Sequence, residues 1–230
     1  MEAIVLAGGM AERMGEAAGG RPKSLVTVGG RHLLHWQIGR LRQAGVDRVI
    51  VSCADGQQQD FEADLDGLGV EIICAAEPER LGRGGAIRFA ATFREGSGDL
   101  LAMNGDELVA VDFTELLERH RASGAAATVT VAQPPSQFGQ VDVDDDDVVR
   151  GFHEVGVVPY WVNCGIYALS PEAVGRFPAK GDHETTIFPE LAAEGGLRAF
   201  RHTGLWLTVN TPKELRRADE YVTAHPEWLT

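Results

Sequence analysis

The feature that most constrains this chain is a glycine pair placed directly after its first apolar run. Residues 3–6 are apolar and lead into Gly8 and Gly9, with Arg13 and Lys23 further along. Glycines leave backbone N–H groups unobstructed, so a turn of this kind can close on a phosphate, and the two cations can neutralise its charge. The other interpretation is an ordinary glycine turn between a strand and a helix, with two surface cations.

The order of these residues distinguishes the turn from two other phosphate-binding loops. It has neither the G-x-x-x-x-G-K-[ST] spacing of the P-loop nor the G-x-G-x-x-G spacing of dinucleotide-binding folds. The whole chain contains only three lysines, Lys23, Lys180 and Lys213. This scarcity favours a functional interpretation of the lysine that follows the glycines.

Short apolar runs alternate with helical patterns in the first half of the chain. The predicted strands are 3–6, 48–53, 70–75 and 99–103, and the predicted helices are one that stops at Gly45, then 84–93 and 113–121. This alternation predicts a Rossmann-like α/β fold of three layers, in which helices cover both faces of a mostly parallel central sheet. Ligands of such sheets bind beyond the carboxyl ends of the strands, where the glycine turn, 53–55 and 104–107 fall.

The pattern changes to more β structure after residue 124. The predicted strands are 126–131, 140–143, 148–152 and 160–169, followed by helices at 185–193 and from Thr211 to about residue 223. Thr211, Pro212 and Glu214 predict the start of the last helix as its N-cap, first and third helical residues. The four aspartates at 144–147 lie between two predicted strands, where a solvated hairpin turn is favoured over a metal site.

Composition limits which partners the protein can bind and in which cellular compartment we expect it. The formal net charge is −13 and the isoelectric point about 4.9, which argues against nucleic acid and anionic membranes because both require basic surfaces. The three cysteines are scattered and odd in number, which fits a reducing compartment. With no basic leader and no apolar run of membrane-spanning length, we expect a cytoplasmic protein.

Further segments complete a pattern that extends over nearly the whole chain. In order they are L-A-G-G-M at 6–10, P-K-S-L at 22–25, E-P-E-R-L-G-R-G-G-A-I at 77–87, N-G-D at 104–106, F-H-E at 152–154, Y-W-V-N-C-G-I-Y at 160–167, G-D-H-E at 181–184 and W-L-T-V-N-T-P at 206–212. Together these segments resemble the sugar-1-phosphate nucleotidyltransferases, which make nucleotide sugars. The similarity is nearest to the short mannose-1-phosphate guanylyltransferase-like branch.

The resemblance implies a reaction, a cofactor and a set of site residues. A sugar-1-phosphate oxygen attacks the α-phosphate of a nucleoside triphosphate and expels pyrophosphate, with Mg²⁺ as cofactor. The implied catalytic residues are Arg13, Lys23 and Asp106, and no covalent nucleophile is needed. The implied nucleotide-binding residues are Leu6, Ala7, Gly8, Gly9, Met10, Ala11, Arg13, Lys23, Gln57, Glu79, Gly82, Gly85, Asn104 and Asp106. The implied acceptor-binding residues are Gly139, Glu154, Asn163, Gly165 and Glu184.

The resemblance also implies an organisation of the chain. We expect a single nucleotidyltransferase domain over 1–230, with a nucleotide-binding half at about 1–124 and a sugar-phosphate-binding half at about 125–210. A C-terminal helix at 211–225 would complete it. Because members of this family often form homo-oligomers, self-association is a further expectation. We expect His32, His35 and His120, which fall in helical patterns, to take no part in the reaction.

Several residues depart from the family pattern. Ala11 and Glu12 stand where glycine and a threonine or serine are usual. Val155 replaces the lysine that contacts the acceptor phosphate, so another cation, such as Arg150 or Arg201, would have to supply the charge. Asn210 occupies one position of the second metal aspartate. Its amide oxygen can still bind Mg²⁺ without a formal charge. Glu107 either restores that charge beside Asp106 as a metal ligand or is a solvated loop residue.

These departures leave three functions open. The first is nucleotidyl transfer to a sugar 1-phosphate or a sugar-like cyclitol 1-phosphate, with GTP as the expected nucleotide because the nearest branch uses it. The second is cytidylyl transfer to a phosphorylated alcohol such as phosphocholine. The polar set of Glu154, Asn163 and Glu184, suited to several hydroxyls, weighs against this. The third is a nucleotide-sugar binding or regulatory protein without activity. The missing aspartate and lysine support it, whereas the presence of Arg13, Lys23 and Asp106 opposes it and favours the first function.

Overall fold

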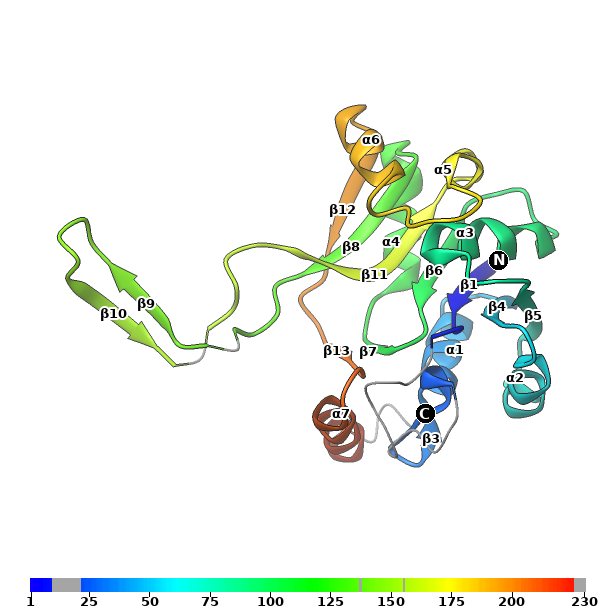
Figure 1. Ribbon diagram of the computed structural model, residues 1–230, viewed down its shortest axis with the longest axis horizontal. Helices are drawn as coiled ribbons and strands as arrows, with labels where there is room; N and C mark the ends of the chain where they lie inside the picture. The colour runs from blue at the N-terminus through cyan, green and yellow to red at the C-terminus, as the bar shows by residue number, and fades with distance from the viewer. Residues whose placement is uncertain (10–21, 137, 155, 226–230) are drawn as a thin grey trace.

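Seven strands form one central sheet in the computed structural model, which describes residues 1–9, 22–136, 138–154 and 156–225. The strands are β1 Glu2–Leu6, β4 Arg48–Ala54, β5 Glu71–Glu77, β6 Leu100–Asn104, β8 Ala127–Ala132, β11 Val162–Leu169 and β12 Leu197–Arg201. Their spatial order is β12-β8-β11-β6-β1-β4-β5 (Figure 1). Strands from both halves of the sequence therefore share one sheet.

The directions of these strands agree with the predicted α/β class. β6, β1, β4 and β5 run parallel to one another, β12 runs parallel to β8, and β11 is antiparallel to both of its neighbours. β12 has no counterpart among the strands predicted from the sequence. It lies at the edge of the sheet and carries Arg198 and Arg201, so the apolar run that marks a buried strand is absent.

Helices cover both faces of the sheet. On one face lie α1 Leu33–Gln43, α2 Gln58–Leu65 and α4 Phe113–Ser123, which share a buried cluster with Ala3 and Val5 of β1. On the other face lie α3 Gly82–Ala90, α5 Pro171–Arg176 and α6 Ile187–Ala193, packed with Ile4. Successive residues of a strand point to opposite faces. The two clusters therefore follow directly from an apolar strand with helices on each side.

A smaller third cluster lies at the C-terminal helix, α7 Pro212–Ala224. It packs against two small ribbons, β2 Thr27–Val28 with β3 Arg31–His32, and β7 Glu107–Val109 with β13 Trp206–Thr208. The N-terminus of α7 is as predicted: the Thr211 hydroxyl accepts a hydrogen bond from the Glu214 N–H at 3.2 Å. This ribbon pairing brings residues about a hundred positions apart, Glu107 and Thr208, side by side.

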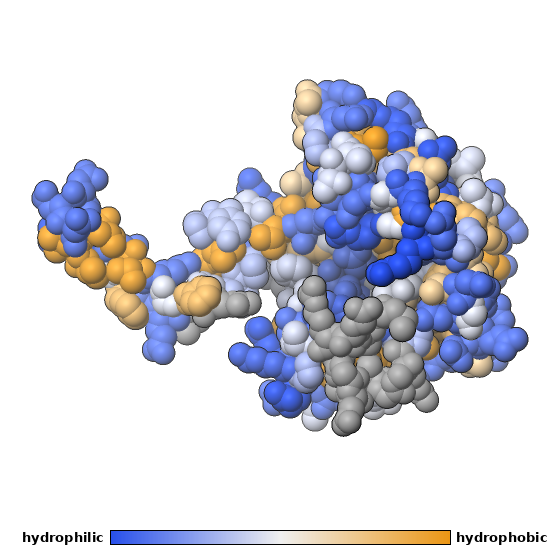
Figure 2. Space-filling view, viewed as in Figure 1, coloured by the Kyte–Doolittle hydropathy of each residue, from blue (hydrophilic) through white to orange (hydrophobic). Residues whose placement is uncertain are grey.

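A β-hairpin, β9 Gln140–Val143 with β10 Val149–His153, projects from the body of the protein (Figure 1). Its four aspartates form the turn at the tip, where the Asp144 carboxylate accepts the N–H groups of Asp146 and Val148. Apolar side chains of the hairpin face solvent, and Phe152 is 69% exposed (Figure 2). Among the described residues, no helix has the length and apolar character needed to cross a membrane.

Candidate functional site

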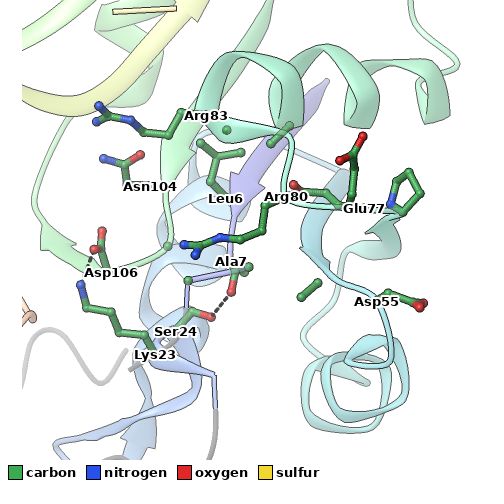
Figure 3. Close-up of a pocket in the computed structure, with 18 residues that line it drawn as sticks. Leu6, Ala7, Lys23, Ser24, Asp55, Glu77, Arg80, Arg83, Asn104 and Asp106 are labelled. Carbon is green, nitrogen blue, oxygen red and sulfur yellow. Dashed lines mark hydrogen bonds and ion pairs between the residues drawn. The ribbon is translucent and has the colours of Figure 1, made fainter. Parts of the chain in front are cut away.

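A pocket of about 440 Å³ opens beyond the carboxyl ends of β1, β4, β5 and β6 (Figure 3). This is the edge of the sheet at which the sequence predicted ligand binding. Its lining residues are Leu6, Ala7, Gly8, Gly9, Lys23, Ser24, Ala54, Asp55, Glu77, Pro78, Glu79, Arg80, Gly82, Arg83, Ala86, Asn104, Gly105 and Asp106. Most of the described residues that the sequence assigned to nucleotide binding are therefore gathered in one cavity, although their binding role stays a prediction.

The glycine turn lies at the floor of this pocket. A side chain at Gly8 would place its Cβ 3.3 Å from the backbone nitrogen of Ala54, which is tighter than ordinary packing, whereas a Cβ at Gly9 would have none of the described residues within 4 Å. Close packing therefore favours glycine at position 8. Met10, Ala11 and Arg13, also predicted at this site, lie outside the described residues.

The turn formed by Asn104, Gly105 and Asp106 is fastened to the end of β1. The Gly105 N–H donates to the Leu6 carbonyl at 2.8 Å, and a Cβ at Gly105 would lie only 2.7 Å from that oxygen. From α1, the Gln37 side-chain amide donates to the carbonyls of Asn104 and Glu107 at 3.1 and 2.6 Å. These contacts therefore hold the backbone of the turn that carries Asp106.

Two oxygens converge on the Lys23 amine at the pocket wall. Lys23 Nζ lies 2.5 Å from Asp106 Oδ2 and also contacts the side-chain oxygen of Asn210. The Lys23 side chain is 13% exposed and that of Asp106 32%. Asn210 is held by α7, because its N–H donates to the Glu214 carboxylate at 2.6 Å. A carboxylate and an amide oxygen are hard ligands of the kind that Mg²⁺ takes, so this pair fits the implied cofactor.

Glu107 is buried, with only 5% of its surface exposed, so the interpretation of a solvated loop residue is wrong. Burial raises the pKa of its carboxyl well above the usual range, and the charge of Asp106 raises it further, while contacts with Asn104 and Lys23 lower it. Burial and the neighbouring Asp106 charge therefore disfavour the charged form of this side chain. It cannot replace the formal charge that Asn210 lacks unless it is deprotonated, and its role as a metal ligand stays a prediction.

The glycines at 82–85 pack against the loop at 179–183. Gly82 has a φ of +75° and lines the pocket, and a Cβ there would lie 2.7 Å from the Gly181 carbonyl. That carbonyl accepts the N–H of Gly84 at 3.0 Å. Gly85 is not a lining residue, and a Cβ there would lie 2.7 Å from the Ala179 carbonyl. These glycines thus permit two backbone segments to approach, and so join the pocket to the second half of the chain.

A polar network continues from the pocket into the predicted acceptor residues. Glu184 Oε1 accepts hydrogen bonds from Arg83 at 2.8 Å, Asn163 at 2.9 Å and the Tyr167 hydroxyl at 2.8 Å. Arg83 also donates to the Asp182 carboxylate at 2.5 and 2.8 Å. The nearby carboxylates of Asp182 and Glu184 raise the pKa of the Arg83 guanidinium against the opposing effect of burial. Arg83 therefore connects the pocket with residues that the sequence predicts to bind the acceptor.

Gly165 lies beside the same network. It has a φ of +66°, and a Cβ there would collide with the Asn104 side-chain amide. The lack of a side chain at Gly165 therefore leaves room for the Asn104 side chain. Of the remaining predicted residues, the Gln57 side chain accepts the Ala54 N–H at 3.2 Å, while Gly139 and Glu154 flank the β9–β10 hairpin; none of the three lines the pocket.

The sequence analysis missed two cations of the pocket. Arg80 and Arg83 both line it, and in the view of Figure 3 Arg80 extends across the opening toward Lys23 and Asp106. Arg150 and Arg201, named as substitutes for the lysine replaced by Val155, are engaged elsewhere. Arg150 pairs with Asp144 at 2.6 Å on the hairpin, and Arg201 lies 5.2 Å over the Trp161 ring. The extra arginine within the L-G-R-G-G segment was the signal available in the sequence.

Comparison with known proteins places this chain in a family. Residues 2–225 match the family model described as nucleotidyl transferase. The chain therefore belongs to the nucleotidyl transferase family, which confirms the resemblance inferred from its motifs.

Individual relatives show which members of the family this chain resembles. The chain is 32% identical over 228 residues to a probable mannose-1-phosphate guanylyltransferase 1 of Oryza sativa subsp. japonica, and 30% identical over 221 residues to a mannose-1-phosphate guanylyltransferase catalytic subunit beta of Drosophila pseudoobscura pseudoobscura. The alignments cover 93% and 92% of this chain but only 62% and 60% of those relatives. The chain thus spans about three fifths of the curated relatives it matches.

Solved structures share the fold over most of the chain. HddC from Yersinia pseudotuberculosis superposes with a TM-score of 0.75 at 25% identity, covering 96% of this chain and 98% of that one. A second structure of HddC is a complex with GMP-PN and gives a TM-score of 0.72 at 23% identity, over 96% of this chain and 98% of that one. These matches confirm the predicted α/β architecture.

Proposed function

We propose that this chain transfers a nucleotidyl group from a nucleoside triphosphate to a sugar 1-phosphate or a sugar-like cyclitol 1-phosphate. The observation that carries the proposal is the grouping of Lys23 with Asp106 and Asn210 at the wall of a pocket floored by the Gly8 turn. A triphosphate is bound by cations and by unobstructed backbone N–H groups. The Lys23 amine supplies the first and the glycine turn the second. The family membership supports the same reaction class.

The reaction joins two anions, so positioning and charge neutralisation supply most of the catalysis. An oxygen of the acceptor phosphate attacks the α-phosphorus in line, the new P–O bond forms as the bond to the bridging oxygen breaks, and pyrophosphate leaves. Lys23 neutralises charge at the α-phosphate as it develops. We assign Arg13 to the β- and γ-phosphates and Gly8 and Gly9 to backbone contacts with the phosphates.

We propose Mg²⁺ as the cofactor. Asp106 and Asn210 would hold it, because their side-chain oxygens converge on one point of the pocket wall that the Lys23 amine now contacts. When bound, the ion neutralises phosphate charge and orients the triphosphate. If these two oxygens held the ion, the Lys23 amine would be available to the α-phosphate.

Arg83 is our candidate for the cation that replaces the missing acceptor lysine. It lines the pocket and contacts Glu184, which also binds Asn163 and Tyr167. A guanidinium offers five donors in a planar fork, so it can keep a carboxylate partner while it donates to a phosphate. The Asn163 amide and the Glu184 carboxylate would then be placed to bind acceptor hydroxyls.

We infer GTP as the nucleotide from the guanylyltransferases among the relatives, together with the GMP-PN bound to HddC.

The other two candidate functions lead to different expectations. Cytidylyl transfer to phosphocholine needs no set of hydroxyl-binding groups, whereas the Asn163–Glu184 network provides one. A binding protein without activity would retain the nucleotide pocket but release no pyrophosphate.

The test is pyrophosphate release with Mg²⁺, crossing the common nucleoside triphosphates with sugar 1-phosphates, cyclitol 1-phosphates and phosphocholine. Release with GTP and one sugar-type 1-phosphate, lost in Lys23→Ala, is the expected result. Release confined to CTP and phosphocholine would replace the proposal with cytidylyl transfer. No release with any pair, from protein that still binds a nucleoside triphosphate in calorimetry, would overturn it in favour of a binding protein.

A further inference from the structure

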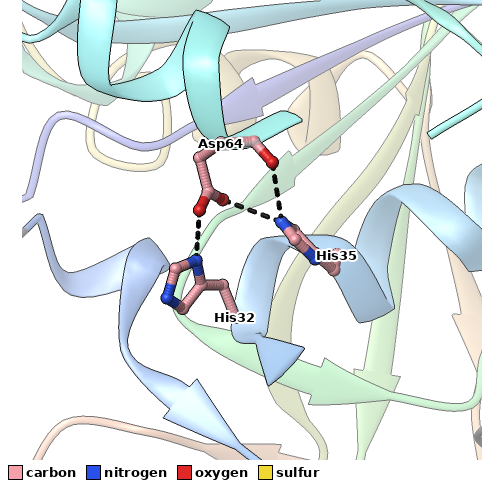
Figure 4. A group of neighbouring side chains, drawn as sticks. All are labelled: His32, His35 and Asp64. Atoms are coloured by element: carbon pink, nitrogen blue, oxygen red, sulfur yellow. Dashed lines mark hydrogen bonds and ion pairs between the residues drawn. The ribbon is translucent and has the colours of Figure 1, made fainter. Parts of the chain in front are cut away.

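Two histidines and an aspartate form a cluster outside the pocket (Figure 4). His32 ends β3 and is the N-cap of α1, His35 lies in the first turn of α1, and Asp64 lies in the last turn of α2. His35 Nε2 lies 2.8 Å from Asp64 Oδ2, and His32 Nδ1 contacts Asp64 Oδ1. Residues from two helices far apart in the sequence thus direct three ligand-type atoms to one point.

We propose that His32, His35 and Asp64 bind one divalent transition-metal ion of the zinc type. Imidazole nitrogen and carboxylate oxygen are common zinc ligands, and three protein ligands with a water in the fourth position form a four-coordinate site. The inference does not depend on the proposed nucleotidyl transfer, because none of the three residues lines the pocket. It also concerns a different ion from the Mg²⁺ assigned to Asp106.

The spacing of the ligand atoms suits such an ion. One ligand atom from each of the three side chains lies within 4.8 Å of the other two. Bonds of about 2.0–2.1 Å in a tetrahedral site place ligand atoms about 3.4 Å apart. To reach that spacing, the 2.8 Å contact between His35 and Asp64 needs to lengthen by about 0.6 Å and the shorter contact between His32 and Asp64 by more, which rotations of the rings and the carboxylate provide.

The cluster is also accessible. The side chains of His32, His35 and Asp64 are 17%, 23% and 17% exposed, so they are held by their surroundings yet reachable from solvent. Two other histidines differ in this respect. His120 is buried and bonded to the Thr128 hydroxyl at 2.9 Å, and His183 is fully buried among aromatic rings. Within the part of the chain that the structure describes, no other group of three such side chains meets the same spacing.

The position of the cluster defines what the ion would do. It would connect the N-terminal end of α1 to the C-terminal end of α2, where the histidine–aspartate contacts lie. α1 also carries Gln37, which holds the backbone at Asn104 and Glu107. A metal at this point would act as a structural link that stabilises the support of the pocket, and it would supply no group to the reacting phosphates.

The experiment measures metal binding by the 230-residue chain directly. The protein is freed of metal with a chelator, then titrated with Zn²⁺ in calorimetry while millimolar Mg²⁺ is present. Co²⁺ replaces Zn²⁺ in a parallel absorption measurement, because its visible spectrum reports tetrahedral coordination. We expect one equivalent of Zn²⁺ per chain, a higher melting temperature with Zn²⁺, and a tetrahedral Co²⁺ spectrum.

Three variants make the result specific. His35→Ala and Asp64→Asn should each weaken Zn²⁺ binding by more than tenfold. His153→Ala is the matched control, since it removes another histidine that pairs with an aspartate, Asp142 at 3.2 Å, on the projecting hairpin. Circular dichroism verifies the fold of each variant, and Asp64→Asn retains the shape of the side chain should His35→Ala fail to fold. The absence of one-equivalent binding in the unaltered chain, or equal binding in Asp64→Asn and His153→Ala, would overturn the proposal.

Discussion

Lys23 Nζ lies 2.5 Å from Asp106 Oδ2, and this contact joins two segments that are 83 residues apart in the sequence. The lysine comes from the 3₁₀ turn Lys23–Leu25, and the aspartate follows β6. Both are partly buried, so their attraction is screened less than that of a surface pair. The lysine predicted to act at the phosphates and the aspartate predicted to hold the metal therefore lie in direct contact.

Lys23→Ala should lower turnover by about 10²–10³-fold, because a cation that meets charge developing in the transition state contributes on this scale. The variant should still fold, because Lys23 is not part of the hydrophobic core. Steady-state pyrophosphate release and circular dichroism provide the measurement. Lys213→Ala, which removes an exposed lysine of α7, is the control. A folded Lys23→Ala variant with normal turnover would remove this residue from the mechanism.

Asp106→Asn should raise the Mg²⁺ concentration needed for half-maximal rate, because the variant loses the one charged ligand of the Asp106–Asn210 pair. Asn210→Asp should shift the same titration toward lower Mg²⁺ or leave it in place. Titrating the rate with Mg²⁺ at saturating nucleotide distinguishes the two variants. An unchanged titration for Asp106→Asn contradicts the assignment of this residue. A folded, inactive Asn210→Asp variant would instead show that the amide acts as a hydrogen-bond donor.

Much of this site could be predicted from the sequence because its signals are local. The glycine turn, the N-G-D segment and the T-P-x-E start of the last helix each depend on a few neighbouring residues. The parallel sheet then places the ends of β1 and β6 at one edge, so Gly8 and Asp106 line the same pocket. The fold class follows from the same alternation of strands and helices.

The contacts that the sequence did not reveal depend on distant backbone packing. Arg83 reaches Asp182 and Glu184 only because the glycines at 82–85 let the loop at 179–183 approach. Glu107 is buried because β7 pairs with β13, a ribbon of three residues in each strand that carries little periodicity of its own. Likewise His32 and His35 gain Asp64 through the packing of two helices. None of these contacts can be predicted from the spacing of residues along the sequence.

Arg83→Ala should raise the KM for the sugar-type acceptor by about tenfold to a hundredfold, which corresponds to about 1.5–3 kcal/mol for a hydrogen bond to a charged group. The KM for the nucleotide should change less. Arg176→Ala, which removes a surface arginine paired with Glu190 and Glu194, is the matched control. Initial rates with each substrate varied in turn supply the values. Equal changes in both KM values, or a change only in that for the nucleotide, would contradict an acceptor-side role.

Glu107→Gln should make the protein more resistant to unfolding as the pH rises above about 5. Burial raises the pKa of the Glu107 carboxyl above its unfolded value of 4.5, so the folded state binds the extra proton between these two pKa values. The free energy of unfolding therefore falls as pH rises through that window, and the glutamine removes this contribution. Melting temperatures of both proteins from pH 5 to 8 measure the effect. Parallel curves would show that Glu107 ionises with its ordinary pKa.

His183 should make the fold sensitive to acid, with the opposite sign. The ring stacks on Phe177 at a centroid distance of 4.9 Å, and neither ring nitrogen has a hydrogen-bond partner among the described residues. Burial lowers its pKa from 6.5 to about 4, so the unfolded chain binds the proton first as pH falls. The contribution is fully present above pH 6.5 and decreases toward pH 4, by about 3 kcal/mol in all.

His183→Phe tests this acid sensitivity, because a phenyl ring occupies similar space among Phe177, Tyr167 and Phe188 but takes up no proton. Chemical denaturation at pH 7 and pH 5 gives the free energy of unfolding for both proteins. The loss of stability between the two pH values should be smaller in the variant. His120→Phe is the comparison, since His120 is also buried but keeps a hydrogen bond to Thr128. If His183→Phe loses as much stability at pH 5 as the unaltered chain, the proton taken up on unfolding belongs to another group, and the ring at 183 serves only to fill the aromatic cluster that supports the 179–183 loop.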